Sequence, residues 1–269
     1  MARYLTTDDL DAIADRVLRA YAGLPEVRAA GQLLYVDPEL LLKALLGLAV
    51  EYRRLSADGT TLGITAFDEV GVEICDEEEL FFFDGRTVLI ETGLLAEDQT
   101  GRRNFTVMHE GCHHILKMLF PADYAGGASA RRVLRYRDTR SARTREEWQV
   151  DRLTSAILMH RDLVGQAMRL AGQDGRIAML NALWRPKEYE RFCRMCHLLG
   201  VSKQALSIRM MGLGLLGEEH LRHPNEILDV TMEEDEEQDE GKERDAGIQE
   251  VPGLRLACDG QGHADIGSC

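Results

Sequence analysis

The stretch FTVMHEGCHHILK, residues 105–117, constrains the fold more than any other part of the chain. Its apolar residues recur at the spacing of one helix face: Phe105, Met108, Cys112, Ile115, Leu116 and Leu119. On such a helix His109 and His113 lie one turn apart on the same side, so both imidazoles can point at one metal ion. Glu110 is rotated from His109 by about 100° and therefore lies beside that ion.

The spacing His-Glu-x-x-His is typical of zinc peptidases, in which the glutamate takes a proton from a water that the metal activates. In this interpretation His109 and His113 are metal ligands and Glu110 is the catalytic base. The alternative is a solvated helix with incidental histidines. His114 is one step off the ligand face and is therefore the weaker candidate for a metal ligand.

A catalytic zinc ion usually has three protein ligands and one open position, so a third ligand is required. The segment TREEWQVDRLTSAILM offers Glu147 and Asp151 four positions apart on one predicted helix. If Glu147 binds the metal, Asp151 can accept a hydrogen bond from the far ring nitrogen of a ligand histidine. Glu146 is the neighbouring alternative. Thr144 and Glu147 also fit a capping box, in which Glu147 would bond backbone N–H groups instead.

The remaining pattern predicts an α+β fold. We expect helices over residues 6–22, over 37–55 after the Asp37-Pro38 start signal, over 145–159, and on both sides of Gly200. Short strand-like runs at 61–67, 71–76 and 86–92 predict a small, partly antiparallel sheet. The run LFFF at 80–83 is expected to be buried, and the polar segment 122–145 to be a linker.

Charge divides the chain into two parts. Residues 218–269 hold 16 acidic residues against 4 Lys/Arg, and so carry most of the net charge of −14. We therefore expect a folded domain over 1–217 and a disordered acidic tail over 218–269. The near-neutral folded part lacks the basic surface of a strong autonomous nucleic-acid binder. Metal binding by Cys258, His263 and Cys269 in the tail would be weak at most.

Three blocks of the sequence together resemble the ImmA/IrrE family of metallopeptidases. RRNFTVMHEGCHHIL is similar to the family's Arg-x-Phe-Thr-x-x-His-Glu-x-x-His helix, and EWQVDRLTSAILM to its Glu-x-x-Ala-Asp/Asn block. VSKQALSIRMMGLGLL, residues 201–216, is similar to its Val-Ser-x-x-Ala-x-x-x-Arg block. The resemblance covers roughly residues 1–217. It implies a mostly helical, zincin-like peptidase core, Glu147 as the third ligand, Glu110 as the general base, and substrates that are often transcriptional repressors.

The chain departs from the family pattern at two positions. Val150 stands where the family has a small residue, and His160 stands where it has proline. Neither departure touches a predicted ligand. His160, Tyr136 and His114 remain equal candidates for stabilising an oxyanion, and the sequence does not choose among them.

The segment 188–216 has the outline of a helix-turn-helix, in which Lys203, Gln204 and Ser207 would face base edges. Only two basic residues lie in its second helix, so we expect it to pack on the core or dock a substrate rather than bind DNA. It also contains Cys193 and Cys196 in the pattern Cys-x-x-Cys-His, which haem attachment and redox pairs share. Because this pattern lies in mid-helix, we interpret both cysteines as packed thiols.

The motif and its setting predict a zinc-dependent intracellular endopeptidase, and the resemblance to the ImmA/IrrE family implies that its substrate is a helix-turn-helix repressor of a stress response or mobile element. Mn2+ is the alternative metal. The alternative function is a non-enzymatic DNA- or protein-binding regulator with a structural zinc site. Because we find no signal peptide and no apolar stretch of about 18 residues, we expect a cytoplasmic location, free cysteines and no contact with membranes.

Overall fold

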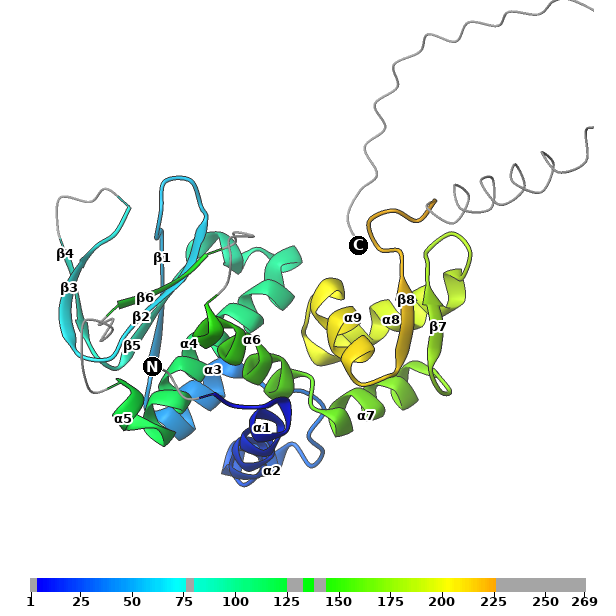
Figure 1. Cartoon of the computed structure of the whole chain (residues 1–269), viewed down its shortest axis with the longest axis horizontal. Helices are drawn as coiled ribbons and strands as arrows, with labels where there is room; N and C mark the ends of the chain where they lie inside the picture. The colour runs from blue at the N-terminus through cyan, green and yellow to red at the C-terminus, as the bar shows by residue number, and fades with distance from the viewer. Residues whose placement is uncertain (1–3, 76–79, 125–132, 138–143, 226–269) are drawn as a thin grey trace, which may run out of the picture.

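The structure is a computed structural model that describes residues 4–75, 80–124, 133–137 and 144–225. Helices and strands are mixed along the chain (Figure 1), so the predicted α+β class is confirmed. The helices are α1 Thr7–Ala22, α2 Pro25–Ala29, α3 Pro38–Leu41, α4 Thr100–Leu119, α5 Pro121–Tyr124, α6 Arg145–Leu158, α7 Arg161–Ala171, α8 Pro186–Leu199 and α9 Lys203–Gly212. A π-helical turn, η1 Leu42–Leu46, follows α3, and two 3-10 turns precede α4, η2 Thr92–Leu95 and η3 Glu97–Gln99. The strands are β1 Ala49–Arg53, β2 Thr61–Ala66, β3 Glu69–Glu73, β4 Leu80–Asp84, β5 Thr87–Glu91, β6 Val133–Arg137, β7 Ile177–Leu180 and β8 Leu216–Glu219.

The main sheet has the strand order β1-β5-β2-β6. β1 runs parallel to β5, whereas β2 is antiparallel to both β5 and β6. The prediction of a small, partly antiparallel sheet is therefore confirmed. Strand β6 ends this order, so within the described residues one of its edges has no neighbouring strand.

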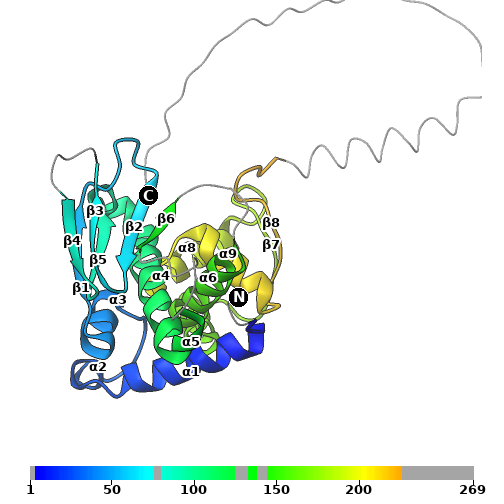
Figure 2. The same ribbon diagram turned by 60° about the vertical axis from the view of Figure 1, so that its left-hand side comes forward.

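The main sheet lies between two layers. Helix α4 packs against one face, and the hairpin of β3 and β4 covers the other (Figure 2). The larger hydrophobic core lies on the helical side, and a smaller cluster around Ile64, Phe83 and Leu89 lies under the hairpin. Burial on both faces explains why all residues of β2 and β5 are buried.

The long helix predicted for residues 37–55 is wrong in its second half. Asp37 caps α3 as expected, since its carboxylate accepts a hydrogen bond from the Leu40 N–H at 3.1 Å. Gly47 then adopts a left-handed conformation with φ of 65° and ends the helical segment. The residues after it form β1, because pairing with β5 satisfies their backbone groups and outweighs their helical pattern.

Two further expectations are wrong because strand pairing decides the structure of the segments concerned. The linker predicted over 122–145 contains β6, whose pairing partner β2 lies about 70 residues earlier in the chain. The run LFFF is not uniformly buried. It forms β4, in which Phe83 faces the smaller core while Phe82 is 74% exposed, because β4 pairs only with β3 and one face of that hairpin meets solvent.

The C-terminal helices belong to the same core as the N-terminal ones. Phe192 of α8 and Leu206 of α9 are fully buried in the larger cluster. The Arg209 side chain is also buried. It donates a hydrogen bond to the Met159 carbonyl oxygen at the end of α6 and pairs with Asp11 of α1. Arg209 therefore ties α9 to two helices of the N-terminal part.

The turn between α8 and α9 packs tightly against the N-terminal end of α4. A Cβ atom placed on Gly101 would overlap with the backbone of Val201 and Ser202. Asn104 donates a hydrogen bond to the Gly200 carbonyl oxygen at 2.9 Å. This close backbone approach fixes the first turns of α4. No helix of the described ranges combines the length and the apolar character needed to cross a bilayer.

The domain boundary predicted after residue 217 falls inside β8. Glu218 and Glu219 pair with β7, and the Asn181 side chain donates a hydrogen bond to the Pro224 carbonyl oxygen. The ordered chain therefore includes residues 218–225. The tail predicted for the residues after them lies outside the described part.

We predict that two truncations differ in stability. Removing residues 226–269 should leave the melting temperature unchanged, because the described contacts are all retained. Removing residues 218–269 should lower it by several degrees, since half of β8 and its pairing with β7 are lost. Calorimetry of both truncated proteins beside the full chain measures the difference. Equal melting temperatures for the two truncations would show that β8 contributes nothing.

Candidate metal centre

The sequence motif on α4 faces the interior of the protein. His109 and His113 are 0% and 1% exposed, and Glu110 is 0% exposed. The solvated-helix alternative is therefore wrong for this segment. The helical pattern around 105–117 is confirmed, and the polar side chains of the motif are embedded in an otherwise apolar helix face.

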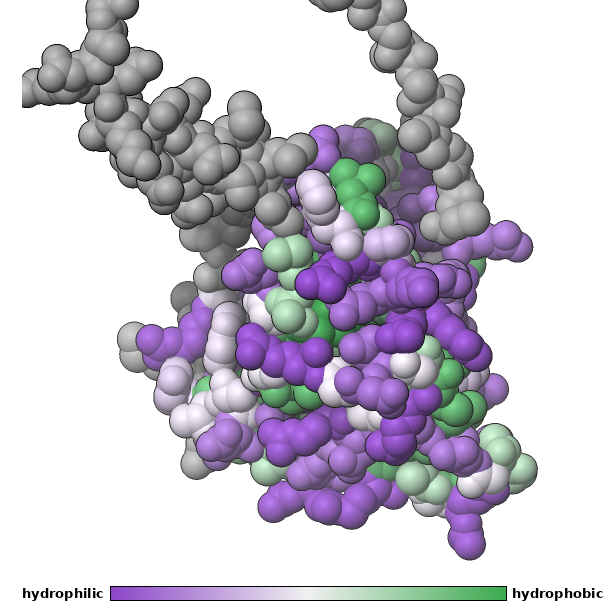
Figure 3. Space-filling view, turned by 90° about the vertical axis from the view of Figure 1, so that its right-hand side faces the viewer, coloured by the Kyte–Doolittle hydropathy of each residue, from purple (hydrophilic) through white to green (hydrophobic). Residues whose placement is uncertain are grey.

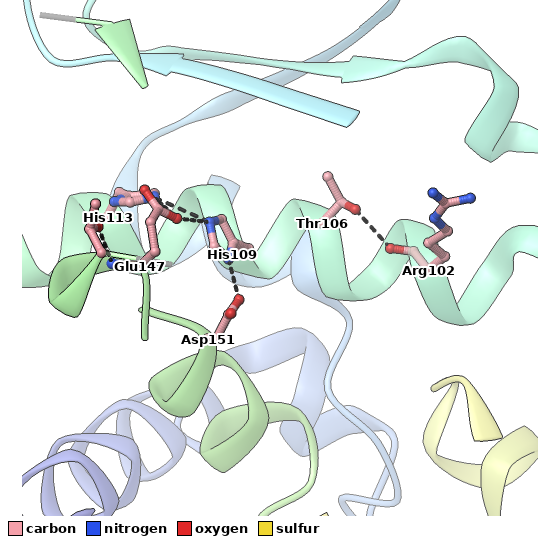
Figure 4. A network of polar contacts seen from close by, with 7 residues as sticks. Arg102, Thr106, His109, His113, Glu147 and Asp151 are labelled. Carbon is pink, nitrogen blue, oxygen red and sulfur yellow. Dashed lines mark hydrogen bonds and ion pairs between the residues drawn. The ribbon is translucent and has the colours of Figure 1, made fainter. Parts of the chain in front are cut away.

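His109, His113 and Glu147 bring three ligand atoms to one point (Figure 4). The His109 Nε2 atom lies 3.2 Å from His113 Nε2 and 3.2 Å from Glu147 Oε2. The third edge of this triangle, from His113 Nε2 to Glu147 Oε2, measures 3.8 Å. Two imidazole nitrogens and a carboxylate oxygen that converge in this way form a set that could hold one metal ion.

The third residue of this set comes from α6, as the spacing argument requires. Thr144 caps α6 by accepting a hydrogen bond from the Glu147 N–H at 3.2 Å. The Glu147 carboxylate does not complete a capping box, however, because it turns toward the two histidines. Glu147, rather than Glu146, is the member of the set.

Asp151 lies one helical turn after Glu147 and supports the site from outside. The His109 Nδ1–H group donates a hydrogen bond to Asp151 Oδ1 at 3.0 Å. This bond fixes the orientation of the His109 ring, so that its Nε2 atom faces His113 and Glu147, and it favours the tautomer whose Nε2 is free for a metal once the ring has lost its second proton. The structure thus gives Asp151 the supporting position that the sequence predicted.

Glu110 lies beside the three ligands without joining them. Neither of its carboxylate oxygens has a hydrogen-bond partner among the described residues. Burial is the largest influence on the pKa of Glu110 and raises it, the neighbouring His109 lowers it, and the Glu147 carboxylate raises it, so that the resulting pKa is about 8. A buried carboxyl group without a partner is costly, which is a feature of functional rather than structural positions.

The ligands have different affinities for protons. Burial lowers the pKa of His109, but the hydrogen bonds with Asp151 and Glu147 outweigh it and raise the value to about 9. Burial together with the neighbouring His109 lowers the pKa of His113 to about 3. Although burial opposes it, the two histidines hold the pKa of Glu147 below its usual value. In the metal-free protein at neutral pH, His109 therefore carries the proton that a metal ion would displace.

Of the three candidates for stabilising an oxyanion, the structure brings Tyr136 to the site. Its ring lies over His109, with 4.0 Å between ring centroids. His114 instead bonds the Thr65 hydroxyl at 2.7 Å and links α4 to β2. His160 caps α7 and pairs with Asp15 of α1 at 2.7 Å, so this candidate is directed to other partners than the site.

A cleft of about 540 Å3 reaches the metal centre at Glu147. It lies along β6 and the β3 strand of the hairpin, and its lining includes Arg135, Arg137 and Glu73. Sequence reasoning missed this cleft because it treated residues 122–145 as a linker. The alternation of Leu134 and Tyr136 with Arg135 and Arg137 was too short to identify a strand.

Cys193 and Cys196 form no second site in the described structure. Cys196 is 6% exposed, and burial raises the pKa of its thiol to about 12. A thiol that stays protonated at neutral pH is a poor nucleophile and metal ligand. Both cysteines are free, and the interpretation as packed thiols agrees with the structure for Cys196, which is buried, whereas Cys193 is only half-buried. Cys258, His263 and Cys269 lie outside the described residues.

Comparison with protein-family models found no match for this chain. A search of curated proteins also found no similar sequence. The side chains around His109 and His113 therefore carry the functional argument.

We predict that Glu147→Ala abolishes metal binding while Glu146→Ala retains it. Removing the carboxylate leaves two histidines, which do not hold zinc as a stoichiometric ligand set. Elemental analysis after dialysis against a metal buffer gives the content per chain. If Glu146→Ala loses the metal and Glu147→Ala keeps it, the ligand assignment is off by one position.

We predict that metal affinity rises with pH. Because His109 has a pKa of about 9, one proton must leave for each metal ion bound below that pH. The apparent affinity should therefore increase about tenfold per pH unit between pH 6 and 8. Competition with a chelator of known pH dependence measures this slope. A flat profile would contradict the assigned protonation of His109.

Proposed function

We propose that this chain is a zinc-dependent endopeptidase of the ImmA/IrrE type that cleaves a regulatory protein. The observation that carries the proposal is Glu110, a fully buried carboxylate without a hydrogen-bond partner in the described structure, placed beside three convergent metal ligands. A purely structural metal site needs no such base and fills its fourth position with a protein ligand. Here the three ligands leave that position for water or substrate.

The spacing of the ligand atoms supports zinc. Bonds of 2.0–2.1 Å in a tetrahedron place neighbouring ligand atoms about 3.3 Å apart. The observed edges of 3.2, 3.2 and 3.8 Å are close to this value. The imidazole-rich set also favours zinc over manganese, which prefers oxygen ligands. We keep Mn2+ as the second candidate because one of the three ligands is a carboxylate.

The arrangement of the elements supports a zincin-like core. Helix α4 carries the motif beneath the main sheet, and α6 delivers both the third ligand and its supporting aspartate. These are the two blocks in which the sequence resembles the ImmA/IrrE family. The third block contains Arg209, which holds α9 against α6 and α1.

In the proposed reaction, a bound zinc ion supplies the Lewis acidity that polarises the attacking water and the scissile carbonyl group. The Glu110 carboxylate accepts a proton from that water and passes it to the leaving amine. Asp151 keeps His109 in the tautomer that binds metal. Tyr136 covers the His109 ring and shields this side of the site from bulk water.

The cleft supports a protein substrate. It runs along β6, whose outer edge has no strand beside it in the described ranges, so an extended peptide could pair with that edge and reach Glu147. Arg135 and Arg137 line the cleft and favour acidic side chains in the bound segment. We propose a helix-turn-helix repressor as the substrate, which rests on the resemblance to the ImmA/IrrE family.

Several contacts count against the alternative of a DNA-binding regulator. Ser207 is 1% exposed, and the Lys203 ammonium bonds the Tyr189 hydroxyl at 3.1 Å. The N-terminal end of α9, which would have to enter the major groove, packs against Gly101 of α4. Hydrophilic residues dominate the face that carries β7 and β8, and the apolar residues between them form small separate groups (Figure 3).

We predict that Glu110→Gln keeps the fold and the metal but loses proteolysis. The amide has nearly the same size and is not a ligand, whereas it cannot accept the proton. Because general acid–base catalysis contributes about 10² to 10⁴ in rate, residual cleavage should be barely detectable. Wild type, Glu110→Gln and the surface control Glu190→Gln are incubated with candidate repressors and zinc or manganese, and products are read by mass spectrometry.

Three outcomes of this experiment are decisive. Cleavage by wild type and Glu190→Gln alone supports the proposal. Equal cleavage by all three proteins removes the assignment of catalysis to this site. Binding of a repressor without cleavage by any of them favours the non-enzymatic regulator.

A further inference from the structure

Gly63 occupies an unusual place in the main sheet. It lies in the middle of β2, where all six residues are buried. A glycine in a buried strand loses side-chain packing and weakens the strand, and it often marks a place where another group approaches the backbone closely. A side chain at position 63 would point toward α4 and, specifically, toward Glu110.

The Glu110 side chain fills the space that a side chain at position 63 would need. A Cβ atom on Gly63 would lie 3.0 Å from both Cγ and Cδ of Glu110 and would overlap with Oε1. The backbone of β2 therefore forms the wall against which the carboxylate rests. Since neither carboxylate oxygen has a hydrogen-bond partner in the described structure, steric contact rather than hydrogen bonding limits its position.

A β-bulge aims Gly63 at α4. The register between β2 and β6 shifts between Thr61 and Gly63. As a result Leu62 packs into the larger core on the helical side, whereas Ile64 packs into the smaller core under the hairpin. In a regular strand, residues two positions apart would share a face. The bulge thus lets Leu62 and Gly63 both contribute to the helical side, and bulges commonly re-aim residues next to active sites.

We propose that Gly63 is a positioning residue for the catalytic base. Its missing side chain leaves the only volume in which the buried Glu110 carboxylate stays beside the three metal ligands. Any side chain at this position turns the carboxylate away from the metal centre while leaving His109, His113 and Glu147 in place. The catalytic consequence rests on the proposed peptidase function, whereas the steric coupling between Gly63 and Glu110 does not.

The coupling is tested by a double-mutant cycle with the full chain. Melting temperatures are compared for wild type, Gly63→Ala, Glu110→Ala and the double variant, with zinc and again after chelation. Gly63→Ala changes the melting temperature by a certain amount in each background. This change should be more destabilising by about 2–4 °C when Glu110 is present than in the Glu110→Ala background. In that background alanine gains the better strand propensity without the clash. The same change of melting temperature in both backgrounds would overturn the proposal.

Gly165 provides a matched control. It lies in α7, and a Cβ atom there would meet only the Arg169 side chain at 3.8 Å, an ordinary contact. Gly165→Ala should therefore act equally in both backgrounds. The two cycles should therefore differ. If the cycle with Gly165 shows the same coupling as the cycle with Gly63, the effect does not arise from the contact with Glu110, and the proposal is overturned.

A second measurement separates positioning from a structural role. Gly63→Ala should bind one metal ion per chain like wild type, and on any repressor that wild type cleaves it should lower kcat at least tenfold with little change in KM. Coupling in the cycle without cleavage by wild type would leave the positioning of Glu110 intact and remove the peptidase function. Cleavage by Gly63→Ala at the wild-type rate would leave the peptidase function and remove the role of Gly63.

Discussion

The burial of four ionisable side chains at one point is the constraint on which the rest of the structure depends. His109, Glu110, His113 and Glu147 meet between α4, α6 and the main sheet, and the first three are nearly inaccessible to solvent. Such a cluster costs free energy unless a cation or a proton compensates its charges. Without metal, protons supply this compensation: His109 holds one, and burial raises the pKa of Glu110 to about 8, so its carboxyl group is mostly protonated at neutral pH although it has no hydrogen-bond partner in the described structure. The fold retains this cost, which is consistent with the metal site that we propose.

The sequence predicts the part of this site that lies on helices. Helical spacing alone places His109 and His113 on one face, and the interval between Glu147 and Asp151 places a ligand and its supporting group on another. Each of these pairs lies within one helix and only four residues apart, so its geometry does not depend on the rest of the fold. The choice between Glu147 and Glu146 required the structure, because it depends on where α6 begins and how it is rotated relative to α4.

The sheet side of the site was missed for a physical reason. β1 lies in a segment with helical periodicity, and β6 lies in a polar segment, yet both become strands because partners far away in sequence satisfy their backbone groups. Tyr136 was one of three equal candidates on sequence grounds and Gly63 was not a candidate, because the pairing that sets these two residues opposite each other across β2 and β6 cannot be read from local pattern. A glycine inside a predicted strand was the one available signal, since glycine is unfavourable there unless a neighbour needs the space.

The C-terminal block shows why a local motif does not define a function. The outline of α8, a glycine turn and α9 is shared by DNA-binding domains and by helix pairs that only pack. Here the turn fixes the start of α4, while Arg209 joins α9 to the end of α6 and to α1. These contacts hold both ligand-bearing helices at points remote from the ligands. The distances between the three candidate ligand atoms are consequently set by packing in the absence of metal, which would lower the ordering cost of binding a metal ion.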